Sequence, residues 1–231
     1  MGLMALRDTE ALEFARTCIP RKEEIKITDV LGDYKVRVMP QYMSMLGSMC
    51  DYGVRSYYPN RDYAYLELGM IMQGVDDWVE FLTTQFHLSA EQAYYLCSYR
   101  ELREPVNLNS SVERDYDNLV HRAVELFSCF NLINPCFGRY YTVTGAVKSF
   151  ECDCVDDRLI LDMKVCLNVK RLKEYWTQVL LYTMLAYMVD KRVRTTIGLI
   201  LPVQGRIMWF TYPKDQYMSM VKEFKRLYVQ D

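Results

Sequence analysis

The segment from Glu151 to Lys164 constrains the fold more than any other part of this chain. Its residues alternate in the manner of two β-strands, Glu-Cys-Asp-Cys-Val and Arg-Leu-Ile-Leu-Asp-Met-Lys, around Asp156-Asp157. Because successive side chains of a strand point to opposite faces, the cysteines, leucines and methionine share one apolar face. Asp153, Asp162 and Lys164 share the other face. The pattern therefore predicts a β-hairpin with one face against a core and one polar face.

The turn fixes which residues of the hairpin lie opposite one another. With Asp156-Asp157 as a two-residue turn, residue 153 lies opposite residue 160, and Glu151 lies opposite Asp162. Asp153 and Asp162 are then diagonal neighbours, with Cα atoms about 7–8 Å apart, so both carboxylates reach one cation. Glu151 and Asp162 form a like-charge pair that destabilises the sheet unless a cation lies nearby. Two interpretations stay open: a solvated polar face, or a metal site with a lysine beside it.

A helix predicted over residues 171–189 follows this hairpin. It is apolar nearly all round, so we expect it to be buried between layers. Gln178 and Tyr182 are one helical turn apart and therefore lie on the same side. A buried glutamine without a partner costs about 1–3 kcal/mol, so we expect polar groups beside it.

These motifs together resemble those of a known superfamily. The series Asp153-x8-Asp162-x-Lys164, then Gln178-x3-Tyr182 on a helix, resembles the PD-(D/E)XK nuclease superfamily in its RecB-like branch. Residues 132–137 and 197–207 resemble segments that flank the same core in small microbial and viral-type members. Residues 46–55 resemble the helical first motif, Leu-Gly-x-x-x-His/Asp, with Asp51 where many relatives have histidine. The resemblance covers residues 40–212.

The resemblance implies a metal-dependent nuclease and a role for each motif residue. Asp153 and Asp162 would bind one or two Mg²⁺ or Mn²⁺ ions, with the Met163 carbonyl and Asp51 as further ligands. Lys164 would position or activate the attacking water, while Gln178 and Tyr182 would orient Lys164 and the substrate backbone. Hard oxygen ligands suit Mg²⁺, and the metal supplies a nucleophile and neutralises charge at the leaving oxygen.

The chain departs from the family pattern at three places. The second carboxylate is Asp162 rather than glutamate, which other RecB-like relatives share. Val165 stands where a threonine or serine commonly follows the lysine, which bears on substrate positioning. Lys148 occupies the position of an aspartate in an alternative alignment, so Asp153 is the preferred ligand.

Cysteine and histidine usage bounds the cofactors. The eight cysteines form no C-x-x-C pair, which favours free thiols in a reducing compartment over a disulfide framework. The two histidines do not neighbour a cysteine pair, so we expect no zinc site. Some relatives hold an iron–sulfur cluster with cysteines after the core. No cysteine follows Cys166, so we expect no iron–sulfur cluster. The expected free thiols also favour an intracellular protein, in the cytoplasm or the nucleus.

Charge is distributed unevenly along the chain. Net charge is −2, yet residues 139–231 carry 15 Lys and Arg against 10 Asp and Glu, and residues 1–138 carry 13 against 20. This asymmetry is compatible with nucleic acid on the basic half and a protein partner on the acidic half. With the resemblance to nucleases, we expect DNA rather than RNA. Basic clusters at 170–173 and 191–194 are expected near the site, or are ordinary solvated helix ends. The longest apolar run has eleven residues, too short to span a membrane.

We therefore expect an α/β fold: a restriction-endonuclease-like mixed central sheet of four or five strands flanked by helices, with an N-terminal helical region. Residues 1–40 are expected to be an N-terminal extension, and residues 41–231 a single nuclease-like domain, mainly helical over 41–133 with the sheet core over 134–231. Helices are expected at 8–18, 41–58, 62–86, 89–103, 110–130, 171–189 and 214–229. Strands are expected at 33–40, 140–147, 149–155, 158–164, 194–200 and 206–211.

Two functions stay open from the sequence. The first is a Mg²⁺- or Mn²⁺-dependent deoxyribonuclease, with exonuclease and structure-specific endonuclease undecided. The second is a nuclease fold retained as a non-cleaving nucleic-acid-binding or scaffold subunit of a larger complex, which the acidic N-terminal half and Val165 favour.

Overall fold

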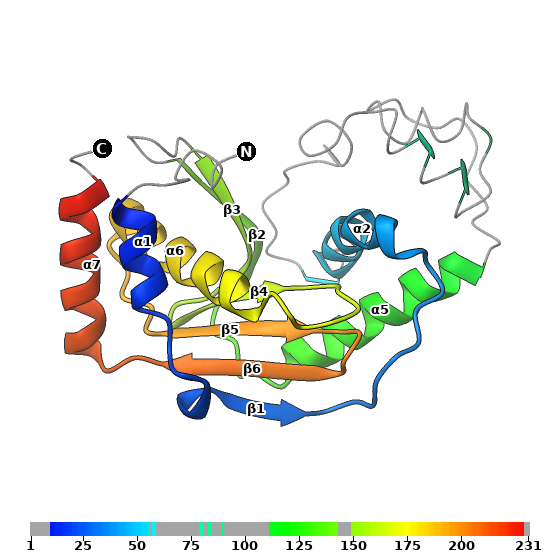
Figure 1. Ribbon diagram of the computed structural model, residues 1–231, viewed down its shortest axis with the longest axis horizontal. Helices are drawn as coiled ribbons and strands as arrows, with labels where there is room; N and C mark the ends of the chain where they lie inside the picture. Colours follow the sequence, from blue (N-terminus) through cyan, green and yellow to red (C-terminus); the bar gives the residue numbers. More distant parts are fainter. Residues whose placement is uncertain are drawn as a thin grey trace.

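A mixed sheet lies at the centre of the molecule (Figure 1). The computed structural model describes residues 10–55, 57–58, 79–80, 83–84, 89, 111–142 and 149–228. Within these residues six strands pair in the order β1-β6-β5-β4-β3-β2. They are β1 (Lys26–Asp29), β2 (Cys136–Thr142), β3 (Ser149–Val155), β4 (Leu159–Met163), β5 (Thr196–Leu201) and β6 (Arg206–Thr211). Neighbours β4 and β5 run parallel, and the other neighbouring pairs run antiparallel.

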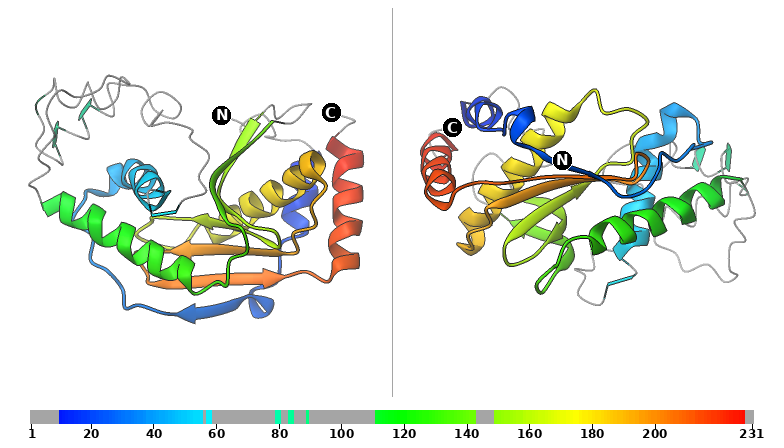
Figure 2. Two further views of the ribbon diagram at one scale, coloured as in Figure 1. Left: turned by 180° about the vertical axis from the view of Figure 1, so that it is seen from behind. Right: turned by 90° about the horizontal axis from the view of Figure 1, so that it is seen from below.

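Helices cover both faces of the sheet and enclose two hydrophobic clusters (Figure 2). The helices are α1 (Glu10–Thr17), α2 (Met43–Arg55), α5 (Ser111–Ser128), α6 (Leu172–Asp190) and α7 (Lys214–Tyr228), with short 3-10 turns at Lys22–Glu24 and Pro40–Tyr42. On one face α1, α6 and α7 pack together, and on the other face α2 and α5 do. The expected α/β class, with a mixed sheet flanked by helices, is confirmed.

Helix α6 makes the crossover between the parallel strands β4 and β5. A parallel pair requires such a long connection, because the chain must return to the edge of the sheet where the first strand began before the second strand can start. Ten of the eleven residues from Trp176 to Ala186 are buried on α6, all except Gln178. A helix that is apolar on every side must lie between layers, as the sequence predicted.

The β2–β3 hairpin turns away from the rest of the sheet (Figure 1). Pairing of β3 with β4 is confined to Cys154 with Leu161 and Val155 with Ile160. Gly138 of β2 has a positive φ of 66°, a backbone conformation that glycine adopts without steric cost. The β2–β3 ladder passes over Gly138 and Asp153, because the printed pairs lie on either side of them. The hairpin changes direction at this point.

This register corrects the predicted hairpin. Val155, not Asp153, lies opposite Ile160, so the strands are offset by two residues from the expected pairing. An even offset keeps the same residues on each face, which is why the polar set stays together. Cys152 departs from the predicted apolar face: it packs in the cluster with α6, whereas Cys154 packs in the cluster with α2. The bend at Gly138 accounts for this difference.

The described residues of the N-terminal segment join the sheet and one of its helical layers. Strand β1 pairs with β6 from Lys26↔Trp209 to Asp29↔Arg206, and α1 packs in the cluster of α6 and α7. The strand predicted at 33–40 is wrong, since this stretch forms no strand. It is held instead by side chains: Asp115 of α5, which is buried, accepts hydrogen bonds from the Tyr34 hydroxyl and the Arg37 N–H.

Most other predicted elements are confirmed to within a few residues. Strand 206–211 and strand 149–155 match their predicted bounds, and the helices at 110–130, 171–189 and 214–229 are formed. Strand β2 begins at Cys136, four residues before its prediction. The helices predicted at 62–86 and 89–103 fall almost wholly outside the described residues.

No helix within the described ranges has the length and apolar character needed to cross a membrane. The seven cysteines in those ranges carry free thiols, and Cys97 lies outside them.

Asp156 builds the turn between β3 and β4 with its side chain. One carboxylate oxygen accepts the N–H groups of Arg158 at 2.6 Å and Leu159 at 2.7 Å, and the other accepts that of Ile133 at 2.9 Å. The carboxylate is fully buried, whereas that of Asp157 is 38% exposed and pairs with Arg192 at the surface.

Asp156→Ala is therefore expected to lower the free energy of unfolding by about 3 kcal/mol, because it leaves buried N–H groups without an acceptor. The matched variant Asp157→Ala is expected to change it by less than about 1 kcal/mol. Urea denaturation of both variants measures the difference. Equal stability of the two would show that the carboxylate of Asp156 does not hold the turn.

Candidate active site

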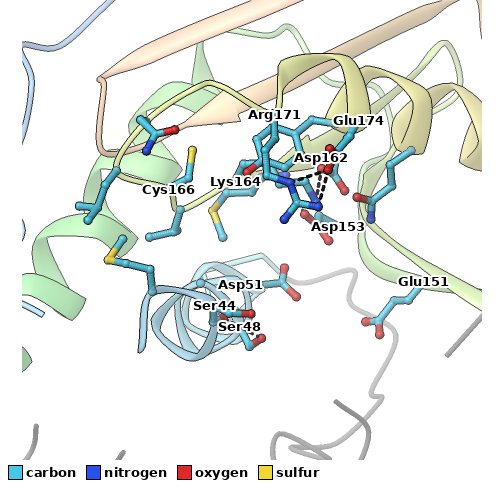
Figure 3. Close-up of a pocket in the computed structure, with 18 of the residues that line it drawn as sticks. Ser44, Ser48, Asp51, Glu151, Asp153, Asp162, Lys164, Cys166, Arg171 and Glu174 are labelled. Atoms are coloured by element: carbon cyan, nitrogen blue, oxygen red, sulfur yellow. Dashed lines mark hydrogen bonds and ion pairs between the residues drawn. The ribbon is translucent and has the colours of Figure 1, made fainter. Parts of the chain in front are cut away.

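A pocket of about 730 Å³ opens where β4 ends, between α2 and the first turns of α6 (Figure 3). Every site residue predicted from the sequence lines this pocket: Asp51, Asp153, Asp162, Met163, Lys164, Gln178 and Tyr182. They come from α2, β3, the end of β4 and α6. Segments more than 100 residues apart in the chain thus contribute to one cavity.

Asp162 and Lys164 form an ion pair at the floor of the pocket. Lys164 Nζ lies 2.6 Å from Asp162 Oδ2, and the Asp162 side chain is 1% exposed. The pKa of Asp162 is raised to about 7, because burial and the charge of Asp153 together outweigh the opposing charge of Lys164. The pKa of Lys164 is raised, since its two neighbouring carboxylates outweigh its own burial. The lysine therefore stays charged, and the negative charge around it is only partly compensated.

Asp153 completes the end of β4 where the β3 ladder has stopped. Its Oδ2 accepts the Met163 N–H at 2.7 Å, in place of a strand carbonyl. On the other side of β4, Lys164 N–H donates to Ile200 O of β5. The N–H and C=O of one strand residue point to the same side, so the Met163 carbonyl faces the gap beside Asp153. The register thus brings two carboxylates and one backbone carbonyl to the same edge.

Helix α2 presents a polar stripe to the pocket. Ser44, Ser48, Asp51 and Arg55 follow one another at intervals of three or four residues, which places them on one side of the helix. Arg55 forms ion pairs with Asp51 and with Glu151 of β3. The pKa of Asp51 is raised to about 8, because burial and the charge of Asp153 outweigh the opposing charge of Arg55.

Tyr175 is a neighbour of Lys164 that the resemblance does not name. The Lys164 Nζ lies 5.5 Å from the centre of the Tyr175 ring, in cation–π range. Gln178 and Tyr182 bind one another, with Gln178 Nε2 donating to the Tyr182 hydroxyl at 2.7 Å. Burial and the charge of Asp162 raise the pKa of Tyr182 well above its usual value, so its hydroxyl stays protonated. The polar company expected for Gln178 is therefore Tyr182 itself.

The pocket holds more negative than positive charge. Its lining contains five carboxylates, Asp51, Glu151, Asp153, Asp162 and Glu174, and three basic side chains, Arg55, Lys164 and Arg171. At full ionisation the formal charge is −2. Close carboxylates of this kind raise one another's pKa and favour a bound cation.

Sequence reasoning gave no role to Arg55, Glu151 or Tyr175 in this pocket. Arg55 follows Asp51 by four residues on a predicted helix, so the spacing alone places the two side chains together. Glu151 was expected opposite Asp162, and the corrected register moves it to Arg55 instead. Tyr175 precedes Gln178 by three residues on α6, which is the same kind of signal.

The two basic clusters lie at opposite ends of α6. Arg171 lines the pocket, but residues 191–194 lie beyond the other end of this 19-residue helix, roughly 28 Å away along its axis. Arg194 is buried and pairs with Asp190 at 2.8 Å. The second cluster is therefore largely structural and does not lie near the site.

Comparisons with protein-family models, curated proteins and solved structures found no match for this chain. Among the residues that the structure describes, no three His, Cys, Asp or Glu side chains converge closely enough to enclose a metal ion. Mg²⁺, however, needs only one or two carboxylates from a protein and keeps several waters. What the pocket can do therefore follows from its two paired carboxylates, one carbonyl and one lysine.

The raised pKa of Asp162 predicts a stability that depends on pH. Between the ordinary aspartate pKa of 3.8 and about 7, the folded chain keeps a proton that the unfolded chain has lost. The free energy of unfolding therefore falls as pH rises through this window. Asp162→Asn, which has no carboxyl proton to lose, is expected to reduce this fall by an amount on the order of a few kcal/mol.

Urea denaturation at several pH values from 5 to 8 measures the effect. Asp157→Asn, at an exposed carboxylate of the same hairpin, is the matched control and is expected to keep the wild-type slope. A pH dependence of Asp162→Asn that parallels wild type would contradict the assignment.

Proposed function

We propose that this chain is a Mg²⁺- or Mn²⁺-dependent nuclease that hydrolyses phosphodiester bonds in DNA, on a restriction-endonuclease-like α/β fold. The observation that carries the proposal is the single pocket lined by all the motif residues, Asp153, Asp162, Lys164, Gln178, Tyr182 and Asp51. These residues were selected from the sequence, by the alternation pattern of the hairpin and by the resemblance to the nuclease motifs. Their meeting in one cavity is unexpected for unrelated surface residues.

The donor set fits a hard divalent cation. Asp153 and Asp162 present carboxylate oxygens from adjacent strands, and the Met163 carbonyl faces the same gap. Oxygen ligands in this small number leave room for the waters that Mg²⁺ retains. At full ionisation the described lining carries a formal charge of −2, and a divalent ion would favour the ionised forms of Asp51 and Asp162, whose pKa values are raised without it. When bound, this ion would lower the pKa of a water and stabilise charge at the leaving oxygen.

Charge also explains why the cation comes before the substrate. DNA is a polyanion, and a cavity with net negative charge repels a phosphate group. Neutralising the cavity leaves Lys164 as a cationic donor toward a phosphate oxygen or the attacking water. Its ion pair with Asp162 and its contact with the Tyr175 ring hold the ammonium group in place.

The remaining motif residues, Gln178 and Tyr182, orient the substrate backbone and form part of the pocket wall. Gln178 and Tyr182 stand beside the floor of the pocket as a hydrogen-bonded pair. Tyr182 stacks on Phe150 of β3, with ring centres 5.2 Å apart, which fixes the tyrosine between α6 and the hairpin. Arg171, 69% exposed, pairs with the exposed Glu174 at the pocket rim, so it would meet the DNA backbone only by exchanging that carboxylate for a phosphate.

Asp162→Ala and Lys164→Ala are expected to slow cleavage of labelled DNA by roughly 100-fold or more, because each removes a group at the reacting phosphate. Mg²⁺ or Mn²⁺ is expected to raise the melting temperature of wild type, and Asp162→Ala to abolish that rise. Lys225→Ala is the matched control, since Lys225 is exposed on α7 at the far end of the molecule (Figure 1).

Equal cleavage by wild type and both site variants would exclude this mechanism. A wild-type chain that neither cleaves nor responds to metal, yet binds DNA or a partner protein, would establish the second function, a non-cleaving subunit.

A further inference from the structure

Arg55 is the most enclosed charged side chain of the pocket lining contributed by α2. It is 5% exposed, and a buried guanidinium is costly to desolvate unless carboxylates surround it. Its two ion pairs reach across the pocket wall, one to Asp51 on the same helix and one to Glu151 on β3. The pKa of Arg55 is raised because these charges, with that of Asp153, outweigh its burial. The guanidinium thus bridges α2 and the hairpin.

The β2–β3 hairpin leaves space for the Arg55 guanidinium at Gly138. A Cβ added at Gly138 would lie 2.6 Å from Arg55 Cζ, closer than nonbonded carbon atoms approach. Gly138 also has positive φ, so β2 bends at the same glycine against which the Arg55 guanidinium packs. The backbone that turns the hairpin is therefore the backbone against which Arg55 packs.

Arg55 takes the place that a cation would otherwise occupy between Asp51 and Glu151. Without it, these two carboxylates and the neighbouring Asp153 would face one another with no counter-charge from α2. Two carboxylates about a guanidinium present oxygen atoms toward a common centre, and oxygen is the ligand of divalent ions.

We propose that Arg55 is a built-in cation that restricts the pocket to one divalent ion, held by Asp153 and Asp162, and keeps Asp51 and Glu151 from binding a second. Asp51, expected as a metal ligand, is on this view a partner of Arg55. The expectation that wild type binds one divalent ion rests on the proposed function. The expectation that an ion can replace Arg55 does not. Arg55 is a positioning residue, because it acts through the two carboxylates.

Counting bound Mn²⁺ by electron paramagnetic resonance titration of the full chain tests the proposal. Arg55→Gln is expected to bind one Mn²⁺ more than wild type. Arg55→Lys, which keeps the charge, is expected to bind the wild-type number. Arg55→Gln with Asp51→Asn, which removes one ligand of the new site, is expected to return to the wild-type number. Arg192→Gln, at an exposed arginine, controls for loss of charge alone.

Folded Arg55→Gln with the wild-type number of ions would overturn the proposal. If this variant fails to fold in EDTA, saturating Mn²⁺ is expected to restore its circular dichroism, and a chain that stays unfolded with Mn²⁺ would overturn the proposal equally. The proposed function is judged separately, by whether wild type binds an ion that Asp162→Ala loses. A gain of one ion on Arg55→Gln counts for Arg55 whether wild type binds one or none.

Discussion

The early end of the pairing between β3 and β4 is the constraint on which the site depends. Had the ladder continued, strand carbonyls and N–H groups of β3 would have satisfied the Met163 backbone, and the Asp153 side chain would have pointed off one face of the sheet. Pairing instead stops after Cys154 and Val155, and the Asp153 carboxylate takes over the Met163 N–H. A splayed pair of strands thus produces a polar edge inside an otherwise apolar layer, because buried backbone groups must find partners.

The pocket concentrates charge that the fold would be more stable without. Burying carboxylates costs desolvation energy that ion pairs repay incompletely, and the raised pKa values of Asp51 and Asp162 express that cost. Arg55 and Lys164 each oppose part of it, from different sides of the cavity. Local arrangements that work against stability gather at functional sites, and under the proposed function the remaining negative charge would favour a bound cation.

How far the sequence predicts this molecule depends on what each signal measures. Alternation in residues 151–164 and the apolar helix after them gave the elements of the core, because burial imposes those periods directly. The faces survived a wrong register since the offset was even. The prediction of a two-residue turn was wrong because the Asp156 carboxylate accepts three backbone N–H groups. One of them belongs to Ile133, 23 residues earlier, and rules based on the two turn residues do not include such a long-range contact.

Other misses have a similar origin. Residues 33–40 alternate like a strand, yet their backbone is held by Asp115 from a helix more than 70 residues later, while the weakly patterned β1 joins the sheet. The pairing of Asp51 with Arg55 was readable from helical spacing, but its extension to Glu151 and Gly138 requires the three-dimensional path of the hairpin. Local sequence patterns predict helices and strands. They do not predict the bend at Gly138, which brings the hairpin against Arg55 and forms one wall of the pocket.

The pairing of β1 with β6 has a consequence for how the chain reaches this structure. Asp29 and Arg206, which face each other across that pair, are separated by 177 residues in sequence. Closing so large a loop carries an entropic cost that slows folding. During synthesis the first strand has no neighbour until the last one has emerged, so the edge of the sheet and the α1–α7 contact are completed late. In that interval the apolar sides of α1 and of the early strands remain open to solvent and to other chains.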